Sequence, residues 1–114
     1  MERDPRAFLW GVYTAAEAIQ SFVHGMDAAA YVNDDMVQAA VERKFEVIGE
    51  ALNQLSRLDH TLSAQIADVP QIVAFHNQLI HGYAKIRPIT VWNATQTSLP
   101  NLLASVRVPL NEST

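Results

Sequence analysis

Apolar residues recur at helical spacing along almost the whole chain, and this periodicity constrains the fold more than any other feature of the sequence. The first run follows Asp4, which precedes a proline as a helix N-cap often does, and Gly25 ends it. The second run opens at Asn33 or Asp34 and closes near Leu58. No alternating strand pattern, internal repeat or low-complexity tract competes with these runs, so the sequence predicts helices.

The second half of the chain predicts shorter helices with proline at their boundaries. One further turn is expected over residues 61–67, and Pro70 opens a third helix at a first helical position. Pro88 starts a fourth helix, which Pro100 must kink or interrupt because proline cannot donate a backbone hydrogen bond. The segment 109–114 is polar and contains a proline, and we expect a frayed tail there.

Helices joined by short turns favour an all-α fold, an up-and-down helical bundle of four to five helices over residues 1–108. The apolar positions of the four runs form its predicted core: Phe8, Leu9, Val12, Ala16, Ile19, Phe22, Val23, Val37, Val41, Phe45, Ile48, Leu52, Leu55, Ile72, Val73, Leu79, Ile80, Val91, Trp92, Leu99, Leu102 and Leu103.

Length and composition limit the classes of protein to which this chain can belong. With 114 residues, 49% hydrophobic and 18% charged, it suits one folded domain and not a disordered tail. A net charge of −4 leaves no overall basic field for a long polyanion, so any nucleic-acid contact must be local. The absence of cysteine excludes disulfides and thiolate chemistry. Without a bilayer-length apolar run or a signal peptide, we expect a soluble, cytoplasmic protein with no membrane contact.

The segment AFHNQLIHGY, residues 74–83, holds the densest group of reactive side chains. On an ideal helix His76 and Tyr83 lie nearly on one face, whereas His81 lies roughly 140° around the axis from His76. One straight helix therefore does not aim both imidazoles at one substrate. Either the helix loosens toward Gly82, or a second copy of the chain brings its own histidine to the same pocket.

Two other interpretations of these histidines compete with catalysis. A helical histidine that is partly buried and bonded to a carbonyl is common, so spacing alone leaves a structural role open. A metal site is less well supported, because the i,i+4 pair of helical zinc sites is absent and the segment contains no carboxylate. We predict neither a metal nor a cofactor.

HNQLIHGY resembles the motif of the HepT-like family of HEPN-domain proteins. That motif is an arginine, a polar residue, three further residues, a histidine, any residue and a tyrosine. Asn77, His81 and Tyr83 match it, and His76 stands in the place of the arginine. VERKFEVIGEAL, residues 41–52, is similar to another segment of the family. DVPQIVAF and Trp92 also have counterparts there, so the resemblance covers most of the chain.

The resemblance implies a HEPN-like helical bundle that acts as a toxin. The family's members are metal-independent ribonucleases acting on RNA, with tRNA among the candidate substrates. The resemblance also implies a composite site, because in the family two motif helices meet across a homodimer. The implied partner is a minimal nucleotidyltransferase antitoxin, which is expected to adenylylate the motif tyrosine, here Tyr83. An alternative within the family is a catalytically impaired protein that only binds the nucleotidyltransferase.

The replacement of the motif arginine leaves three hypotheses open. Arginine binds phosphate oxygens in pairs with a permanent charge, and His76 offers at most two donors that point apart. His76 is therefore an imperfect phosphate group, or it forms an acid–base pair with His81, or catalysis is lost and only binding remains. In the second case Asn77, Lys85 or Arg87 helps to bind the phosphate.

An acidic ladder on the second run offers one more candidate. Glu42, Glu46 and Glu50 recur every fourth residue, and such a ladder is more often a solvated helix face than a site. Only Glu50 is singled out, as a carboxylate that orients the ring of a motif histidine. His24 and His60 are assigned to a helix end and a turn, and are excluded from the site.

Overall fold

The structure is a computed structural model that describes residues 4–81 and 86–112, and within these ranges it contains helices and no strand. This confirms the predicted all-α bundle. Five helices have nine or more residues and two are short. In chain order they are α1 (Pro5–Val23), α2 (Ala28–Val32), α3 (Asp35–Leu58), α4 (His60–Ser63), α5 (Val69–His81), α6 (Pro88–Gln96) and α7 (Ser98–Glu112).

Aspartate side chains fix the starts of the N-terminal helices. Asp4 accepts a hydrogen bond from the backbone N–H of Arg6 at 2.9 Å and caps α1, with proline at the first helical position. Asp34 accepts from the backbone N–H of Val37 at 3.0 Å and caps α3. These bonds satisfy N–H groups that have no partner inside the helix. The boundaries expected near Asp4 and Asp34 are therefore confirmed.

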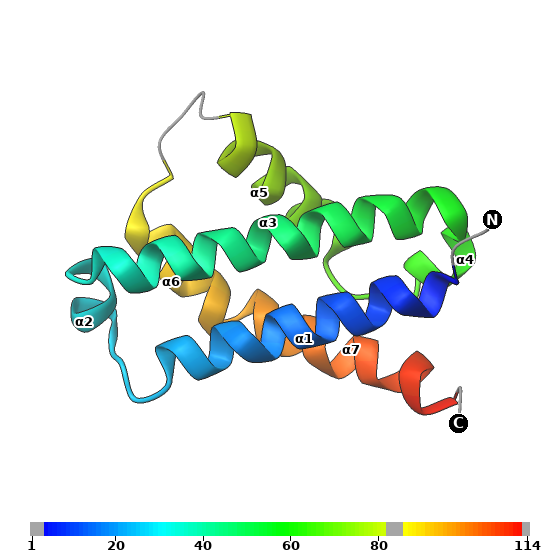
Figure 1. Ribbon diagram of the computed structural model, residues 1–114, viewed down its shortest axis with the longest axis horizontal. Helices are drawn as coiled ribbons and strands as arrows, with labels where there is room; N and C mark the ends of the chain where they lie inside the picture. The colour runs from blue at the N-terminus through cyan, green and yellow to red at the C-terminus, as the bar shows by residue number, and fades with distance from the viewer. Residues whose placement is uncertain (1–3, 82–85, 113–114) are drawn as a thin grey trace.

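The two longest helices form the centre of the molecule. Figure 1 shows α1 and α3 side by side and running in opposite directions, with α6 and α7 on one side of the pair and α5 on the far side of α3 from α1. The core between them is apolar, and many of its side chains are fully buried, including Leu9, Ile19, Ile48, Leu52 and Leu102. The helix α5 thus lies at the edge of the bundle and depends on α3 for its packing.

Two boundaries in the second half differ from the prediction. The expected fourth helix is two helices that meet at Thr97, so the interruption precedes Pro100. Pro100 lies in the first turn of α7, where its missing N–H costs no intrahelical bond. The helix α7 continues through Pro109 to Glu112, and Leu110 is buried. It thus extends into the segment for which the sequence predicts a frayed tail.

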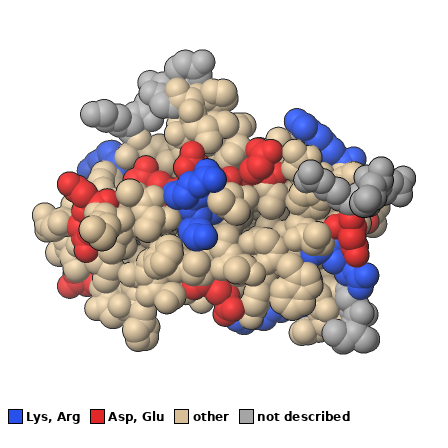
Figure 2. Space-filling view, in the orientation of Figure 1, with Lys and Arg blue, Asp and Glu red and all other residues tan. Residues whose placement is uncertain are grey.

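Charges of both signs are mixed over the visible face of the molecule. Figure 2 shows Lys and Arg as separate patches among Asp and Glu, without a broad basic field. Any contact with a polyanion on this face must therefore use a few residues. Among the helices of the described ranges, none has the length and apolar character needed to cross a bilayer.

Candidate functional site

The motif histidines belong to α5, a helix of 13 residues. Its buried residues are Val69, Ile72 and His76, which recur at helical spacing and face the bundle. Ile80, predicted as a core residue of the same helix, is 48% exposed. Leu79 of α5 is half-buried and packs against the core, so α5 is held along most of its length, and its last two residues, Ile80 and His81, are exposed.

A glycine on α3 makes room for the first motif histidine. A Cβ atom placed on Gly49 would overlap the Cβ and Cγ atoms of His76 and would lie 2.8 Å from its Cδ2 atom. The imidazole thus lies directly on the backbone of α3, and only glycine leaves space for it. With 4% of its surface exposed, His76 is part of the contact between α3 and α5.

The polar atoms of His76 are incompletely satisfied. Its Nε2 atom lies 3.9 Å from Oε2 of Glu50, an ion pair when the ring is protonated. Its Nδ1 atom is buried and has no hydrogen-bond partner among the described residues. Burial of an unpaired nitrogen is costly, so the packing around the ring must offset that cost. Glu50 is the member of the acidic ladder that lies next to a motif histidine, as the sequence suggested.

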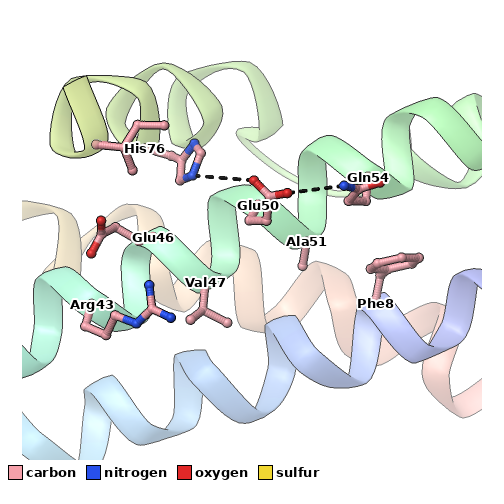
Figure 3. Close-up of a pocket in the computed structure, with 9 residues that line it drawn as sticks. Phe8, Arg43, Glu46, Val47, Glu50, Ala51, Gln54 and His76 are labelled. Carbon is pink, nitrogen blue, oxygen red and sulfur yellow. Dashed lines mark hydrogen bonds and ion pairs between the residues drawn. The ribbon is translucent and has the colours of Figure 1, made fainter.

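A hollow of about 460 Å³ opens beside this contact. Figure 3 shows His76 entering it from α5, Phe8 from α1, and the remaining labelled residues from α3. The α3 residues are Arg43, Glu46, Val47, Glu50, Ala51 and Gln54, and Ile80 of α5 completes the lining. The hollow therefore combines apolar walls with one guanidinium, one imidazole and two carboxylates.

The other predicted site residues do not line this hollow. Asn77 and His81 are exposed, and His81 is the last residue of α5. Arg87 is exposed at the N-cap of α6. Tyr83 and Lys85 lie outside the described residues. The structure thus brings His76 and Glu50 together and does not bring His81 into the same hollow.

Two ionisable side chains outside the lining of the hollow have a raised pKa. Burial raises the pKa of the Glu42 side chain, and the nearby charge of Glu46 adds to the shift. Burial also raises the pKa of the Tyr31 phenol, with a further contribution from Glu42.

In the described parts of the chain, no three histidine or acidic side chains are placed to hold a metal ion.

Gly49, which lies against His76, and Arg43, which lines the hollow, are not among the predicted site residues. Gly49 had a signal in the sequence, because a glycine inside a strongly helical run costs about 1 kcal/mol relative to alanine and needs a packing reason. Arg43 had no such signal in the sequence, because a single arginine beside an acidic ladder is typical of a solvent-exposed helix face. Only the position of α5 against α3 places Arg43 and His76 around one hollow.

Comparison with known proteins finds a family and relatives that match most of the chain. A family model described as "Ribonuclease HepT-like" matches residues 12–108. The protein named "Putative RNase MJ1380" of Methanocaldococcus jannaschii is 28% identical over 94% of this chain and 97% of its own length. "Probable ribonuclease HepT" of Thermococcus cleftensis is 26% identical over 90% of this chain and 92% of its own length. No solved structure matches the chain significantly.

Proposed function

The chain belongs to the ribonuclease HepT-like family, and on that premise we propose that it cleaves RNA without a metal ion, with His81 as the proton-transfer residue. The observation that carries the proposal is the exposure of His81 at the end of the motif helix α5. RNA contains its own nucleophile, the 2′-hydroxyl, so the protein must move protons and stabilise charge on the phosphate. An exposed imidazole can reach that hydroxyl.

The site is completed by a second copy of the chain. His76 is buried against α3 and His81 is exposed outside the hollow, so one protomer does not present both rings to one phosphate. A homodimer in which two α5 helices meet would bring the exposed His81 side chains together. Sedimentation should give a dimer at tens of micromolar, where an interface of standard size persists. A strict monomer would contradict the composite site.

The activity is tested with purified protein and RNA in excess chelator. We expect cleavage that survives the chelator and is lost in His81→Ala. Transfer RNA and a mixed RNA sample should be assayed separately, because they distinguish a tRNA-directed enzyme from a general one. Activity that disappears with the chelator, or that His81→Ala retains, would contradict the mechanism.

Regulation is proposed to act through Tyr83, two residues after His81. A minimal nucleotidyltransferase antitoxin would transfer AMP to its hydroxyl, and the added phosphate would repel RNA. Co-expression with a nucleotidyltransferase from the neighbouring gene, followed by intact-mass measurement, tests this. The adduct should be absent in Tyr83→Phe. Tyr31 is fully buried, so its hydroxyl is not accessible to the transferase in the folded protein.

A second function is favoured by one observation, the burial of His76. A ring that is 4% exposed, and whose Nδ1 atom has no partner in the part of the chain that the structure describes, is unsuited to presenting a cation to phosphate. The protein would then bind the nucleotidyltransferase without cleaving RNA. Growth arrest on expression separates the two functions: the ribonuclease arrests growth and His81→Ala does not, whereas the binding protein and its variant behave alike.

A further inference from the structure

One arginine outside the motif lines the same hollow as His76. Arg43 lies on α3, and Glu50 and Gln54 follow it by seven and eleven residues, which places all three within about 20° of one helix face. That face forms the floor of the hollow, and Figure 3 shows Arg43 on it beside Val47. The helix that supports the motif therefore supplies a guanidinium next to the motif position.

The guanidinium of Arg43 is not used elsewhere in the described structure. Arg6 pairs with Asp4 at 3.3 Å, and Arg107 lies 5.8 Å above the ring of Tyr13. Arg43 is exposed, and within residues 4–81 and 86–112 it makes no ion pair, hydrogen bond or ring contact. Its charge and donors therefore remain available to a ligand.

His76 cannot replace a motif arginine in its chemistry. Its ring lies on Gly49, its Nε2 atom faces Glu50 at 3.9 Å, and its Nδ1 atom is buried. A guanidinium carries a permanent charge and donors that match two phosphate oxygens, whereas an imidazole has two donors pointing apart. The cation that phosphate requires must then come from another residue.

We infer, on the basis of the proposed ribonuclease function and its composite site, in which His81 of a second copy of the chain reaches the phosphate held in this hollow, that Arg43 contacts that phosphate and supplies the cation that position 76 lacks. His76 acts as a positioning residue that holds α5 on α3 and keeps the carboxylate of Glu50 beside its ring. Glu46 shares the hollow and opposes phosphate binding by its charge. Its effect must therefore have the opposite sign to that of Arg43.

Substitution of Arg43 tests the inference more cleanly than substitution of His76, because Arg43 is exposed and His76 is part of the packing. Arg43→Gln should reduce cleavage by about 10²- to 10³-fold, as removal of a group that stabilises transition-state charge does. Arg43→Lys keeps the charge without the forked donors and should retain intermediate activity. Arg57→Gln is the matched control, an exposed arginine on the same helix outside the hollow, and should cleave like the parent.

A binding measurement makes the inference independent of catalysis. In the His81→Ala background, a short fluorescent single-stranded RNA should bind more weakly to Arg43→Gln, and its salt dependence should lose about 0.7 in logarithmic slope, the value for one phosphate contact. Glu46→Gln should bind the RNA more tightly. Thermal unfolding of each variant should match that of the parent, because the substituted side chains are largely outside the core.

The possible outcomes separate this inference from the proposed function. A parent that cleaves RNA and an Arg43→Gln variant that cleaves it equally well would overturn the role of Arg43 and leave the ribonuclease in place. A parent that cleaves nothing would overturn the proposed function, and the binding measurement would then decide the role of Arg43. Equal RNA binding by Arg43→Gln and Arg57→Gln would overturn that role.

Discussion

The helices α1 and α5 both pack on α3, and they do so by different means. The buried residues of α1 are all apolar and recur along its 19 residues. In α5 the buried residues are Val69, Ile72 and a histidine, all in the first eight of its 13 residues. The free energy that holds α1 comes from fully buried apolar side chains, whereas α5 combines half-buried apolar side chains, such as Phe75 with its ring centroid 5.1 Å from that of Phe45, with an incompletely satisfied polar ring. The contact of α1 with α3 is therefore wholly apolar at its buried positions, and the contact of α5 with α3 is not.

The largest effect should be a loss of RNA cleavage at the end of α5 with little change in the stability of the bundle. His81→Ala removes the proposed proton-transfer residue from the exposed end of α5 and should lower RNA cleavage by about 10²- to 10⁴-fold. Because the side chain is exposed, urea unfolding should change little. Cleavage assays paired with circular dichroism measure both effects. If His81→Ala loses activity because it unfolds, the end of α5 contributes to stability, and the contrast drawn between α1 and α5 is wrong.

The next effect tests the apolar side of the comparison. Leu52 on α3 is fully buried, and Leu52→Ala should lower the free energy of unfolding by about 2–5 kcal/mol through lost burial and the cavity that remains. Leu58→Ala is the matched control on the same helix, since Leu58 is 48% exposed and should cost far less. Urea denaturation gives both values. Similar losses in the two variants would show that the core is not organised as described.

Two glycines sharpen the comparison between the helices. Gly49→Ala places a methyl group into the ring of His76, and overpacking of this kind costs about 1–3 kcal/mol. It should also displace α5 and reduce RNA cleavage. Gly11→Ala is the control: an added Cβ on α1 meets nothing within 4 Å, so alanine should stabilise the helix by about 0.5–1 kcal/mol. Opposite signs in thermal unfolding would support the contact, and equal signs would contradict it.

The smallest effect concerns Glu42, which lies in the N-terminal half of α3. Its pKa is raised in the folded state by burial, so the native protein binds the proton more tightly than the unfolded chain does. The contribution of Glu42 to stability is then fully present below about pH 4 and is lost as the pH rises through the raised pKa. Glu42→Gln should flatten this part of the pH profile by less than about 1 kcal/mol, because water screens a side chain that is partly exposed.

The measurement for Glu42 is urea denaturation from pH 4 to neutral pH. Glu17→Gln, an exposed carboxylate on α1, is the control and should follow the parent. A profile that Glu42→Gln leaves unchanged would contradict the assigned cause.

Much of the fold was predictable because its determinants are local. Asp4, Asp34 and the two long apolar stripes act within a few residues of chain, so caps and periodicity predict α1 and α3 closely. The expected fourth helix was less accurate, because proline forbids a hydrogen bond without fixing where the chain turns. The break at Thr97 and the continuation of α7 beyond residue 108 depend on packing against the rest of the bundle.

The sequence by itself determined the helical class, the helix that carries the motif, and the family, since each is written in spacing along the chain. Only the tertiary structure decided that His76 faces inward onto Gly49 while His81 faces water, and that Arg43 shares the hollow of His76. The physical reason is that a side chain's environment is set by the helix packed against it. Residues 43 and 76 are far apart along the chain, and their proximity arises only when α5 packs on α3.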